Sequence, residues 1–293
     1  MNIINGSARV CGVFGNPIEH SISPTIHNYL AERTGQNLVY VPFRIENGYL
    51  GDAVKGAYAL NGLGINVTVP YKSEVMEFLK DIDELAERIG AVNTLVRVEG
   101  GFKGFNTDMP GLYRALCADG VKIEGEKVLI LGAGGVARAV AMLLVEKKAK
   151  EIIVLNRTVE KAQAIVDELS VMTDSCLIKA LPIDAYDTLP VEDKYLAIQA
   201  TNVGMHPKVG EAVIMQADFY KRVHTGYDLV CNPLYTKFME LVEVNGGKAY
   251  NGLKMLLYQG IIAYELWTGC DIGEELAGDV YEVMLSEMKV RGK

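Results

Sequence analysis

Short apolar runs alternate with helically spaced segments along the whole chain. In the N-terminal part, the runs that predict strands cover 8–14, 38–43, 65–69 and 92–98, and the segments that predict helices cover 24–33, 72–79 and 83–89. Continuous apolar runs are typical of buried strands, and an apolar residue at every third or fourth position is typical of a helix. Because strands and helices alternate, this part is expected to form a parallel α/β sheet.

The alternation continues after a helix expected at 108–118, which would join two parts of the chain. Further strands are expected at 128–131, 152–155, 195–200 and 227–231, and further helices after the first of these strands, at 160–169 and at 236–244. Two helical segments, 253–267 and 279–289, follow with no further strand. The pattern predicts a two-domain α/β protein with domains at 1–111 and 112–251, and with C-terminal helices in 252–293 that pack back on the first domain.

A glycine turn follows the strand expected at 128–131. It reads Gly132-Ala133-Gly134-Gly135-Val136-Ala137 and leads into a helix and a second apolar strand. In such a βαβ context the pattern is that of a dinucleotide-binding Rossmann domain, whereas isolated glycines would indicate only a turn. Gly132 would allow the tight turn, Gly134 the close approach of a pyrophosphate, and Ala137 close packing of helix on strand. The N–H groups at the helix N-terminus would bind the phosphates.

The residues after the strand at 152–155 indicate which dinucleotide is bound. An acidic side chain there would bind the ribose 2′-hydroxyl of NAD, but this chain has Asn156-Arg157-Thr158. A guanidinium and a hydroxyl suit a 2′-phosphate, so the sequence predicts NADP. Lys161 lies one helical turn further on, and could either add a second cation or be a solvated lysine.

Composition and charge exclude several other classes of protein. The chain has 293 residues, 49% of them hydrophobic, and a net charge of −8. This charge argues against nucleic acid or an anionic membrane as the main partner. No segment shows a secretion signal or approaches the ~20 apolar residues of a membrane span. Five scattered cysteines without a CxxC pair fit a reducing compartment, and the cysteines and four histidines form no metal-binding pattern. We expect a cytoplasmic protein that binds a small molecule and holds no metal.

Lys72 and Asp108 are candidates for acid–base chemistry. Lys72 follows a strand that Pro70 ends, and the carboxyl ends of strands are where α/β sheets bind ligands. A lysine there can serve as a general acid or base, although the spacing alone favours a solvated lysine. Asp108 precedes Pro110 and could orient substrate beside Lys72, although taken alone it fits an N-cap better.

Ser21 and Ser23 lie before an expected helix. Ser23 followed by Pro24 fits an N-cap, and two hydroxyls at a helix N-terminus would also bind a small carboxylate. The nearby His20 and His27 form no hydrolase triad with them, and no GxSxG motif occurs. Gln259 interrupts an apolar helix, as either a ligand contact or a buried structural amide.

Together these segments resemble the shikimate dehydrogenase family over nearly the whole chain. The matching segments are GNPIEHSISPTIHN (15–28), NVTVPYK (66–72), GAVNTL (90–95), FNTD (105–108), GAGGVARA (132–139), NRT (156–158), DLVCNPLYT (228–236) and NGLKMLLYQG (251–260). Their number, order and spacing exceed what chance produces.

The resemblance implies an N-terminal substrate-binding domain, a Rossmann NADP-binding domain, and NADPH-dependent reduction of 3-dehydroshikimate to shikimate in aromatic amino-acid synthesis. Lys72 and Asp108 would be the catalytic pair. Substrate would be bound by Ser21, Ser23, Asn66, Thr68, Asn93, Thr107, Asp108 and Gln259. NADP would be bound by Gly132, Ala133, Gly134, Gly135, Val136, Ala137, Asn156, Arg157, Thr158, Thr201, Leu229, Gly252 and Met255, with Lys161 as the possible second cation. Monomer and homodimer both remain open.

Three positions depart from the family pattern. Cys231 stands where the family usually has tyrosine, Gln199 where it has asparagine, and Asn202 where serine is common. These departures put in doubt the contacts that the neighbouring residues make with ligands, but not the family.

Three alternatives remain at this point. A quinate/shikimate dehydrogenase that uses NAD would tend to carry an acidic residue after Arg157, where this chain has Thr158. A glutamyl-tRNA reductase would need a reactive N-terminal cysteine and a basic RNA-binding face, but Cys11 lies in an apolar run and the chain is acidic. A non-catalytic NADP sensor would have no reason to keep Lys72 and Asp108.

Overall fold

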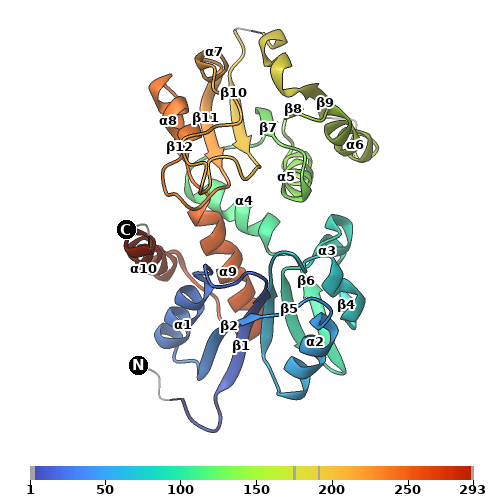
Figure 1. The fold of residues 1–293 in the computed structure, drawn as a ribbon, viewed down its shortest axis with the longest axis vertical. Coiled ribbons are helices and arrows are strands. Elements are labelled where there is room, and N and C mark those ends of the chain that lie inside the picture. The colour runs from blue at the N-terminus through green and yellow to red at the C-terminus, as the bar shows by residue number, and fades with distance from the viewer. Residues whose placement is uncertain (1–3, 174–175, 191, 292–293) are drawn as a thin grey trace. The chain divides into compact units, whose positions relative to one another are not determined.

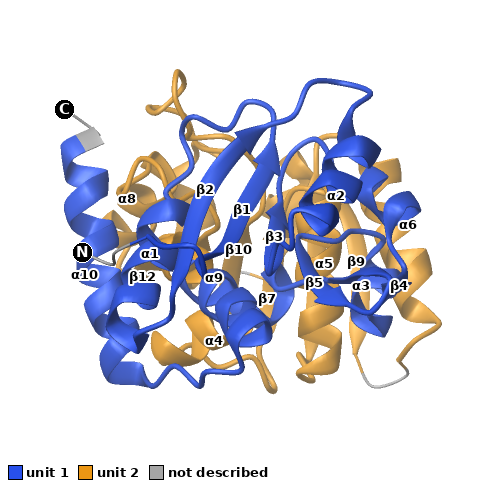
Figure 2. Cartoon of the chain, turned by 90° about the horizontal axis from the view of Figure 1, so that it is seen from below, with its two compact units in different colours: residues 1–112, 257–293 blue, residues 113–256 orange. Residues whose placement is uncertain are grey.

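The chain forms two compact units. The structure, a computed structural model, describes residues 4–173, 176–190 and 192–291. Unit 1 comprises residues 1–112 and 257–293, and unit 2 comprises residues 113–256 (Figure 2). The sequence predicted domain boundaries at 111/112 and 251/252. Residues 1–3 and 292–293, at the outer ends of the predicted domains, lie outside the described residues. Helices α4 (Asp108–Ala118) and α9 (Leu253–Thr268) each begin in one unit and end in the other.

Unit 1 contains a six-stranded sheet in the order β2-β1-β3-β5-β6-β4 (Figure 1). Its strands are β1 (Arg9–Gly15), β2 (Leu38–Arg44), β3 (Gly64–Val67), β4 (Asp81–Ile82), β5 (Thr94–Val98) and β6 (Gly101–Phe105). β1 pairs in parallel with β2 and β3, whereas β5 is antiparallel to both β3 and β6. The expectation of a parallel sheet was therefore wrong for this unit. The turn at Glu99-Gly100 is only two residues long and can join only antiparallel strands.

Helices from both ends of the sequence belong to unit 1. They are α1 (Ser23–Thr34), α2 (Leu50–Ala59), α3 (Glu84–Ile89), the 3₁₀ helix η1 (Glu74–Phe78), the second part of α9, and α10 (Glu274–Arg291). α1 packs on β2 and α10 packs on α1. The indole N–H of Trp267 in α9 donates to the carbonyl of Leu95 in β5 (2.9 Å). The C-terminal segment thus contributes to the core of unit 1.

Unit 2 contains a fully parallel sheet in the order β12-β11-β10-β7-β8-β9. Its strands are β7 (Lys127–Leu131), β8 (Glu151–Asn156), β9 (Leu177–Pro182), β10 (Tyr195–Gln199), β11 (Val223–Asp228) and β12 (Lys248–Tyr250). Its helices are α5 (Gly135–Glu146), α6 (Val159–Ser170), η2 (Ile183–Thr188), α7 (Ala217–Tyr220) and α8 (Lys237–Val244). The chain builds outward from β7 to β9, then returns to β10 on the other side of β7. This is the Rossmann order, and its switch point lies between β7 and β10.

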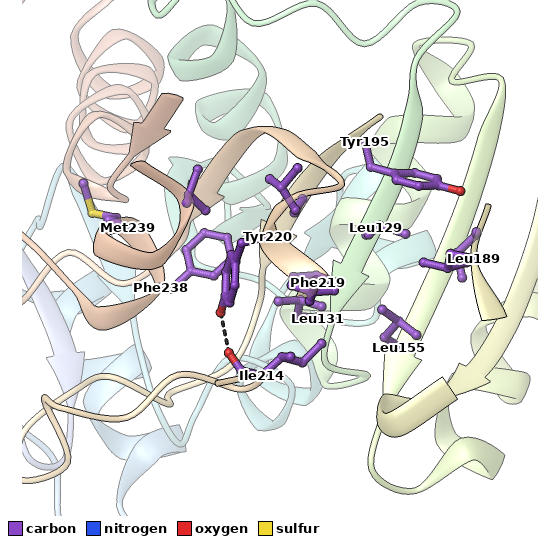
Figure 3. Packing of buried hydrophobic residues seen from close by; sticks show 14 residues of the cluster. Leu129, Leu131, Leu155, Leu189, Tyr195, Ile214, Phe219, Tyr220, Phe238 and Met239 are labelled. Atoms are coloured by element: carbon purple, nitrogen blue, oxygen red, sulfur yellow. Dashed lines mark hydrogen bonds between the residues drawn. The ribbon is translucent and has the colours of Figure 1, made fainter. Parts of the chain in front are cut away.

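Alternate residues of the central strands of unit 2 face one apolar cluster. Leu129 and Leu131 of β7 contribute to it, together with Phe219, Tyr220 and Phe238 from α7 and α8 (Figure 3). The hydroxyl of Tyr220 donates to the carbonyl of Ile214 (2.5 Å), which satisfies the polar end of a buried side chain. The packing holds the carboxyl ends of β7 and β10 in place.

Several elements differ from the sequence expectation. The helix expected at 72–79 is a turn followed by the five-residue η1, and the strand expected at 227–231 lies earlier, as β11. Apolar residues continue past β11 because Val230 is buried in the following loop. The pattern also missed short elements such as β4, β6 and β12. Among the described residues, no helix combines the length and apolar character needed to cross a membrane.

Candidate active site

The backbone around Lys72 is fixed by its buried neighbour. Tyr71 is buried, and its hydroxyl donates to the carbonyl of Ile45 (2.6 Å). The carbonyl of Lys72 accepts a hydrogen bond from the N–H of Val92 (2.8 Å). These bonds hold the turn between β3 and η1, so the lysine projects from an anchored turn rather than from the α-helix expected there.

Asp108 is the first residue of α4, and it does not cap that helix. The side-chain oxygen of Asn106 accepts from the backbone N–H groups of Asp108 (3.1 Å) and Met109 (3.4 Å). The N-cap interpretation of Asp108 was therefore wrong, because Asn106 performs that role. The Asp108 carboxylate remains available for side-chain contacts.

That carboxylate is held through both oxygens. Lys72 Nζ donates to Asp108 Oδ2 (2.6 Å), and Asn93 Nδ2 donates to Asp108 Oδ1 (2.9 Å). The Lys72 and Asp108 side chains are 29% and 22% exposed, so the pair is accessible to a ligand. Charge-assisted bonds of this length orient both partners strongly. The structure thus brings together the two residues proposed for acid–base chemistry.

Asn93 connects this pair to other predicted substrate residues. It is 3% exposed, its Nδ2 also lies 3.0 Å from Thr107 Oγ1, and its Oδ1 accepts from the N–H of Thr107 (2.8 Å). Asn66 Nδ2 donates to the carbonyl of Asn93 (3.2 Å) and to Thr94 Oγ1 (3.0 Å). Five predicted residues, Lys72, Asp108, Asn93, Thr107 and Asn66, therefore form one hydrogen-bonded cluster.

The serine pair lies at the start of α1. Ser23 is the first helical residue, Ile22 precedes it, and no side chain caps this helix. The interpretation of Ser23 as N-cap was therefore wrong. Ser21 Oγ accepts from the N–H of Ser23 (3.3 Å). Both serines are half-buried at the start of the helix.

The remaining predicted substrate residues are Thr68 and Gln259. Thr68 directly follows β3, is half-buried, and its N–H donates to the carbonyl of Phe14 (2.9 Å). Gln259 is half-buried in α9, where its backbone lies against Gly111 of α4. Among the described residues, no side-chain hydrogen bond joins Thr68 to the cluster around Asn93.

The glycine turn of unit 2 lies at the switch point of its sheet. Gly132 has φ +113°, and a Cβ there would lie 2.6 Å from Thr201 Cγ2, so only glycine fits. At Gly134 and Gly135 an added Cβ would meet no atom within 4 Å. The fold itself does not require glycine at these two exposed positions, but the approach of a pyrophosphate would. α5 starts immediately after Gly134, again without a side-chain cap, and the residues present therefore fit a dinucleotide.

The Arg157 side chain, in the segment after β8, is exposed to solvent. Asn156 Nδ2 donates to the carbonyl of Thr158 (2.8 Å), which fixes the turn. Arg157, Thr158 and Lys161 are exposed, and within the described part of the chain Arg157 forms no ion pair. An exposed, uncompensated guanidinium beside a fixed turn is suited to bind a phosphate.

A buried polar network holds the loops after β10 and β11. Gln199 Oε1 accepts from the N–H and Oγ1 of Thr201 (both 2.6 Å), and Gln199 Nε2 donates to Asp228 Oδ1 (3.1 Å). Asp228 also accepts from Thr236 Oγ1 (2.6 Å) and from the N–H of Val230 (2.9 Å). The departure of Gln199 from the family pattern thus has a structural role.

This network borders the last predicted cofactor residues. The N–H of Leu229 donates to the carbonyl of Gln199 (3.0 Å). A Cβ at Gly252 would lie 2.3 Å from the carbonyl oxygen of Leu229, so the chain needs glycine here for close approach. Met255 is half-buried in the first turn of α9. Cys231, at the family's tyrosine position, is a half-exposed free thiol.

Sequence reasoning missed the residues that support this site. Tyr40, Thr94 and Asn106 bond directly to predicted site residues. Thr94 and Asn106 are sequence neighbours of Asn93 and Asp108, and an Asn two residues before a helix start is a capping signal that could have identified Asn106. No group of three or more His, Cys, Asp or Glu side chains suited to a metal occurs among the described residues.

Three family profiles match the chain. They are the shikimate dehydrogenase substrate binding domain at residues 13–95, shikimate/quinate 5-dehydrogenase at 116–189, and the shikimate 5′-dehydrogenase C-terminal domain at 252–276. This chain belongs to the shikimate dehydrogenase family. The resemblance and the two-domain α/β fold expected from the sequence are confirmed.

Individual members of the family are similar over nearly their full length. An NADP(+)-type shikimate dehydrogenase of Desulforamulus reducens is 41% identical over 91% of this chain and 92% of its own. A shikimate dehydrogenase solved with NADP+ has a TM-score of 0.87 and 35% identity, and covers 98% of each chain. The enzyme of Listeria monocytogenes, solved with shikimate and NAD, has a TM-score of 0.87 and 33% identity, and covers 96% of this chain and 98% of its own.

Asp228 gives the site a testable pH dependence. Burial raises its pKa to about 6, although the hydrogen bonds from Thr236, Val230 and Gln199 act in the opposite direction. Because the ordinary value is 3.8, the ionised carboxylate destabilises the folded state increasingly as the pH rises from about 4 to about 6. The free energy of unfolding of Asp228→Asn minus that of the wild type should rise by about 2 kcal/mol between about pH 4.5 and about pH 7.5.

Urea unfolding at several pH values measures this difference. Asp218→Asn is the control, because Asp218 is exposed and its hydrogen bond with Lys221 lowers its pKa. The free energy of unfolding of Asp218→Asn minus that of the wild type should not change with pH in this range. If the same difference for Asp228→Asn also did not change with pH, burial would not raise the pKa of Asp228.

Proposed function

We propose that this chain is a shikimate dehydrogenase, which reduces 3-dehydroshikimate to shikimate with NADPH and catalyses the reverse oxidation. The observation that carries the proposal is the accessible Lys72–Asp108 pair, bonded through Asn93 to further polar side chains that suit a polyhydroxylated ring. Family membership and the NADP-type turn at Arg157 support it. The pair is the feature that a non-catalytic NADP sensor would not need.

Lys72 is the proposed proton donor and acceptor. NADPH supplies the hydride that the ring ketone accepts. An ammonium has three protons, and Asp108 Oδ2 engages one of them. Lys72 can therefore stabilise the developing alkoxide and donate a proton to it, and in the oxidation direction it can accept that proton. Asp108 keeps the ammonium oriented and can accept a hydrogen bond from a ring hydroxyl.

The polar residues of unit 1 would bind the substrate. Ser21 and Ser23, two half-buried hydroxyls at the start of α1, suit its carboxylate. Asn66, Thr68, Asn93, Thr107 and Gln259 would bind ring hydroxyls.

The strand ends of unit 2 would bind NADP. The turn from Gly132 to Ala137 and the first N–H groups of α5 suit the pyrophosphate, and Asn156, Arg157 and Thr158 suit the 2′-phosphate, with Lys161 as a possible second cation. Further contacts to NADP would come from Thr201, Leu229, Gly252 and Met255. We place the enzyme in the cytoplasm, because all five cysteines are free thiols.

Steady-state kinetics with four substrate pairs test the function. Shikimate and quinate are each oxidised with NADP and with NAD, and the value of kcat/KM is expected to be highest for shikimate with NADP. A higher value for quinate with NAD would support the quinate-type alternative. Absence of shikimate turnover with either cofactor would refute the proposed function.

Lys72→Ala tests the proton donor. The variant should fold and bind NADP, but lose about 10²- to 10⁴-fold in kcat, the usual contribution of a general acid–base group. Lys103→Ala is a matched control, because Lys103 is 32% exposed and pairs with Asp81 at 2.8 Å in the same unit. Near-normal turnover of Lys72→Ala, or an equal loss in the control, would rule out this role.

Arg157→Ala tests the cofactor preference. The KM for NADP should rise about tenfold or more, because a charge-assisted bond to phosphate is removed, and the KM for NAD should change little. Lys221→Ala, which removes another exposed cation of unit 2, should change neither. Equal effects of Arg157→Ala on the two cofactors would contradict a 2′-phosphate site.

A further inference from the structure

The hydroxyl of Tyr40 lies among the predicted substrate residues but cannot reach solvent. Tyr40 is in β2 and is 1% exposed. Its hydroxyl donates to Asn66 Oδ1 (2.8 Å). Burial raises the pKa of Tyr40 well above its ordinary value. The hydroxyl therefore stays protonated, and the side chain to which it donates belongs to an asparagine proposed to bind a ring hydroxyl.

The hydrogen bonds continue from Asn66 to the catalytic pair. Asn66 Nδ2 donates to Thr94 Oγ1 (3.0 Å), and Thr94 Oγ1 donates to Asn93 Oδ1 (3.1 Å). Asn93 Nδ2 then donates to Asp108 Oδ1, whose other oxygen binds Lys72. A continuous chain of hydrogen bonds thus runs from Tyr40 to Lys72.

Tyr40 also holds the oxygen of the Asn66 amide. The carbonyl of Asn93 can only accept, so the NH₂ group of Asn66 must face this carbonyl and Thr94. The oxygen of Asn66 then faces Tyr40, whose hydroxyl donates to it. Among the described hydrogen bonds, the buried Asn66 oxygen has no other donor, so loss of the Tyr40 hydroxyl would leave this oxygen unsatisfied.

The rest of unit 1 holds Tyr40 rigidly. The Asn28 side chain accepts from the N–H of Tyr40 and donates to its carbonyl (both 2.9 Å). The His27 ring stacks on the Tyr40 ring at 4.2 Å and 17°, and Trp267 lies 6.1 Å from it. Burial lowers the pKa of His27 to about 3, with the Asn66 side chain acting weakly in the opposite direction, so this stack is uncharged. The Tyr40 ring is therefore held in one position, from which its hydroxyl can hold a neighbouring side chain.

We propose that Tyr40 is a positioning residue for substrate binding, which holds the side chain of Asn66 in place through one buried hydroxyl. The proposal rests on the proposed function of Asn66. It also explains why a tyrosine hydroxyl is kept inside the apolar cluster of His27 and Trp267.

Tyr40→Phe tests the proposal, with Tyr264→Phe as the matched control. Tyr264 is equally buried and belongs to the same ring cluster, but its hydroxyl pairs with Thr34 Oγ1 (2.6 Å), away from the site residues. Tyr40→Phe should raise the KM for shikimate about tenfold, as expected for one lost hydrogen bond. The kcat should fall by less than about threefold, because Asp108 keeps Lys72 and Asn93, and the KM for NADP should not change. Tyr264→Phe should leave all three constants within about twofold of the wild type.

A second measurement needs no substrate. In ¹H–¹⁵N spectra, the side-chain amide resonances of Asn66 should shift in Tyr40→Phe and stay unchanged in Tyr264→Phe. Unshifted amide resonances, or an unchanged KM for shikimate in an active enzyme, would overturn the role of Tyr40. A shifted amide in a chain that does not turn over shikimate would instead refute the proposed function alone.

Discussion

The buried side chain of Asn93 is the interaction on which the arrangement of unit 1 depends. Its amide oxygen receives the N–H of Thr107, and its amide nitrogen donates to Asp108. Its own backbone carbonyl accepts from the N–H of Val67 and from the side chain of Asn66. One residue therefore joins the ends of β3 and β6 to the start of β5 and of α4 through its side chain and its backbone. A buried amide left without these partners would be costly, and this cost makes the register of four elements mutually dependent.

In unit 2, a buried pair of polar side chains fixes the strand ends in a similar way. Gln199 and Asp228 lie opposite each other at the ends of β10 and β11, and their side chains satisfy the first turns of the loops that follow. Gln199 holds Thr201, which in turn lies over Gly132 at the end of β7. The switch point of the sheet is thus bordered by backbone whose position is fixed by buried polar groups. In both units the rigid framework ends where ligand contacts are proposed to begin, an arrangement that pre-organises a site.

The sequence predicted the parts of the structure that depend on local patterns. The glycine turn, the strands on either side of it and α5 were predicted because each has its own apolar period or turn residue. The antiparallel β5–β6 hairpin was not predicted, because the short strand β6 contains two glycines among its five residues and has no apolar run. Lys72 and Asp108 were candidates from the sequence, but only the resemblance favoured their catalytic role, since 36 residues separate them and their contact depends on how β3 and β6 pair with β5. Tyr40 and Thr94 could not be found at all, because a tyrosine and a threonine in strands are ordinary strand residues until their partners are known.

Stability alone does not explain why Lys72 and Asp108 are paired. Ion pairs with exposed side chains contribute little to folding, and Asn106 already caps α4 without help from Asp108. The Lys103–Asp81 pair has a similar length, but its carboxylate is 58% exposed and its second oxygen is not held by a buried amide. In contrast, Asp108 is fixed on its second oxygen by Asn93, which is itself fixed by the fold. The position of the Lys72 ammonium is therefore set by the buried framework rather than by solvent, which is what a proton donor to the oxygen of one defined ring carbonyl requires.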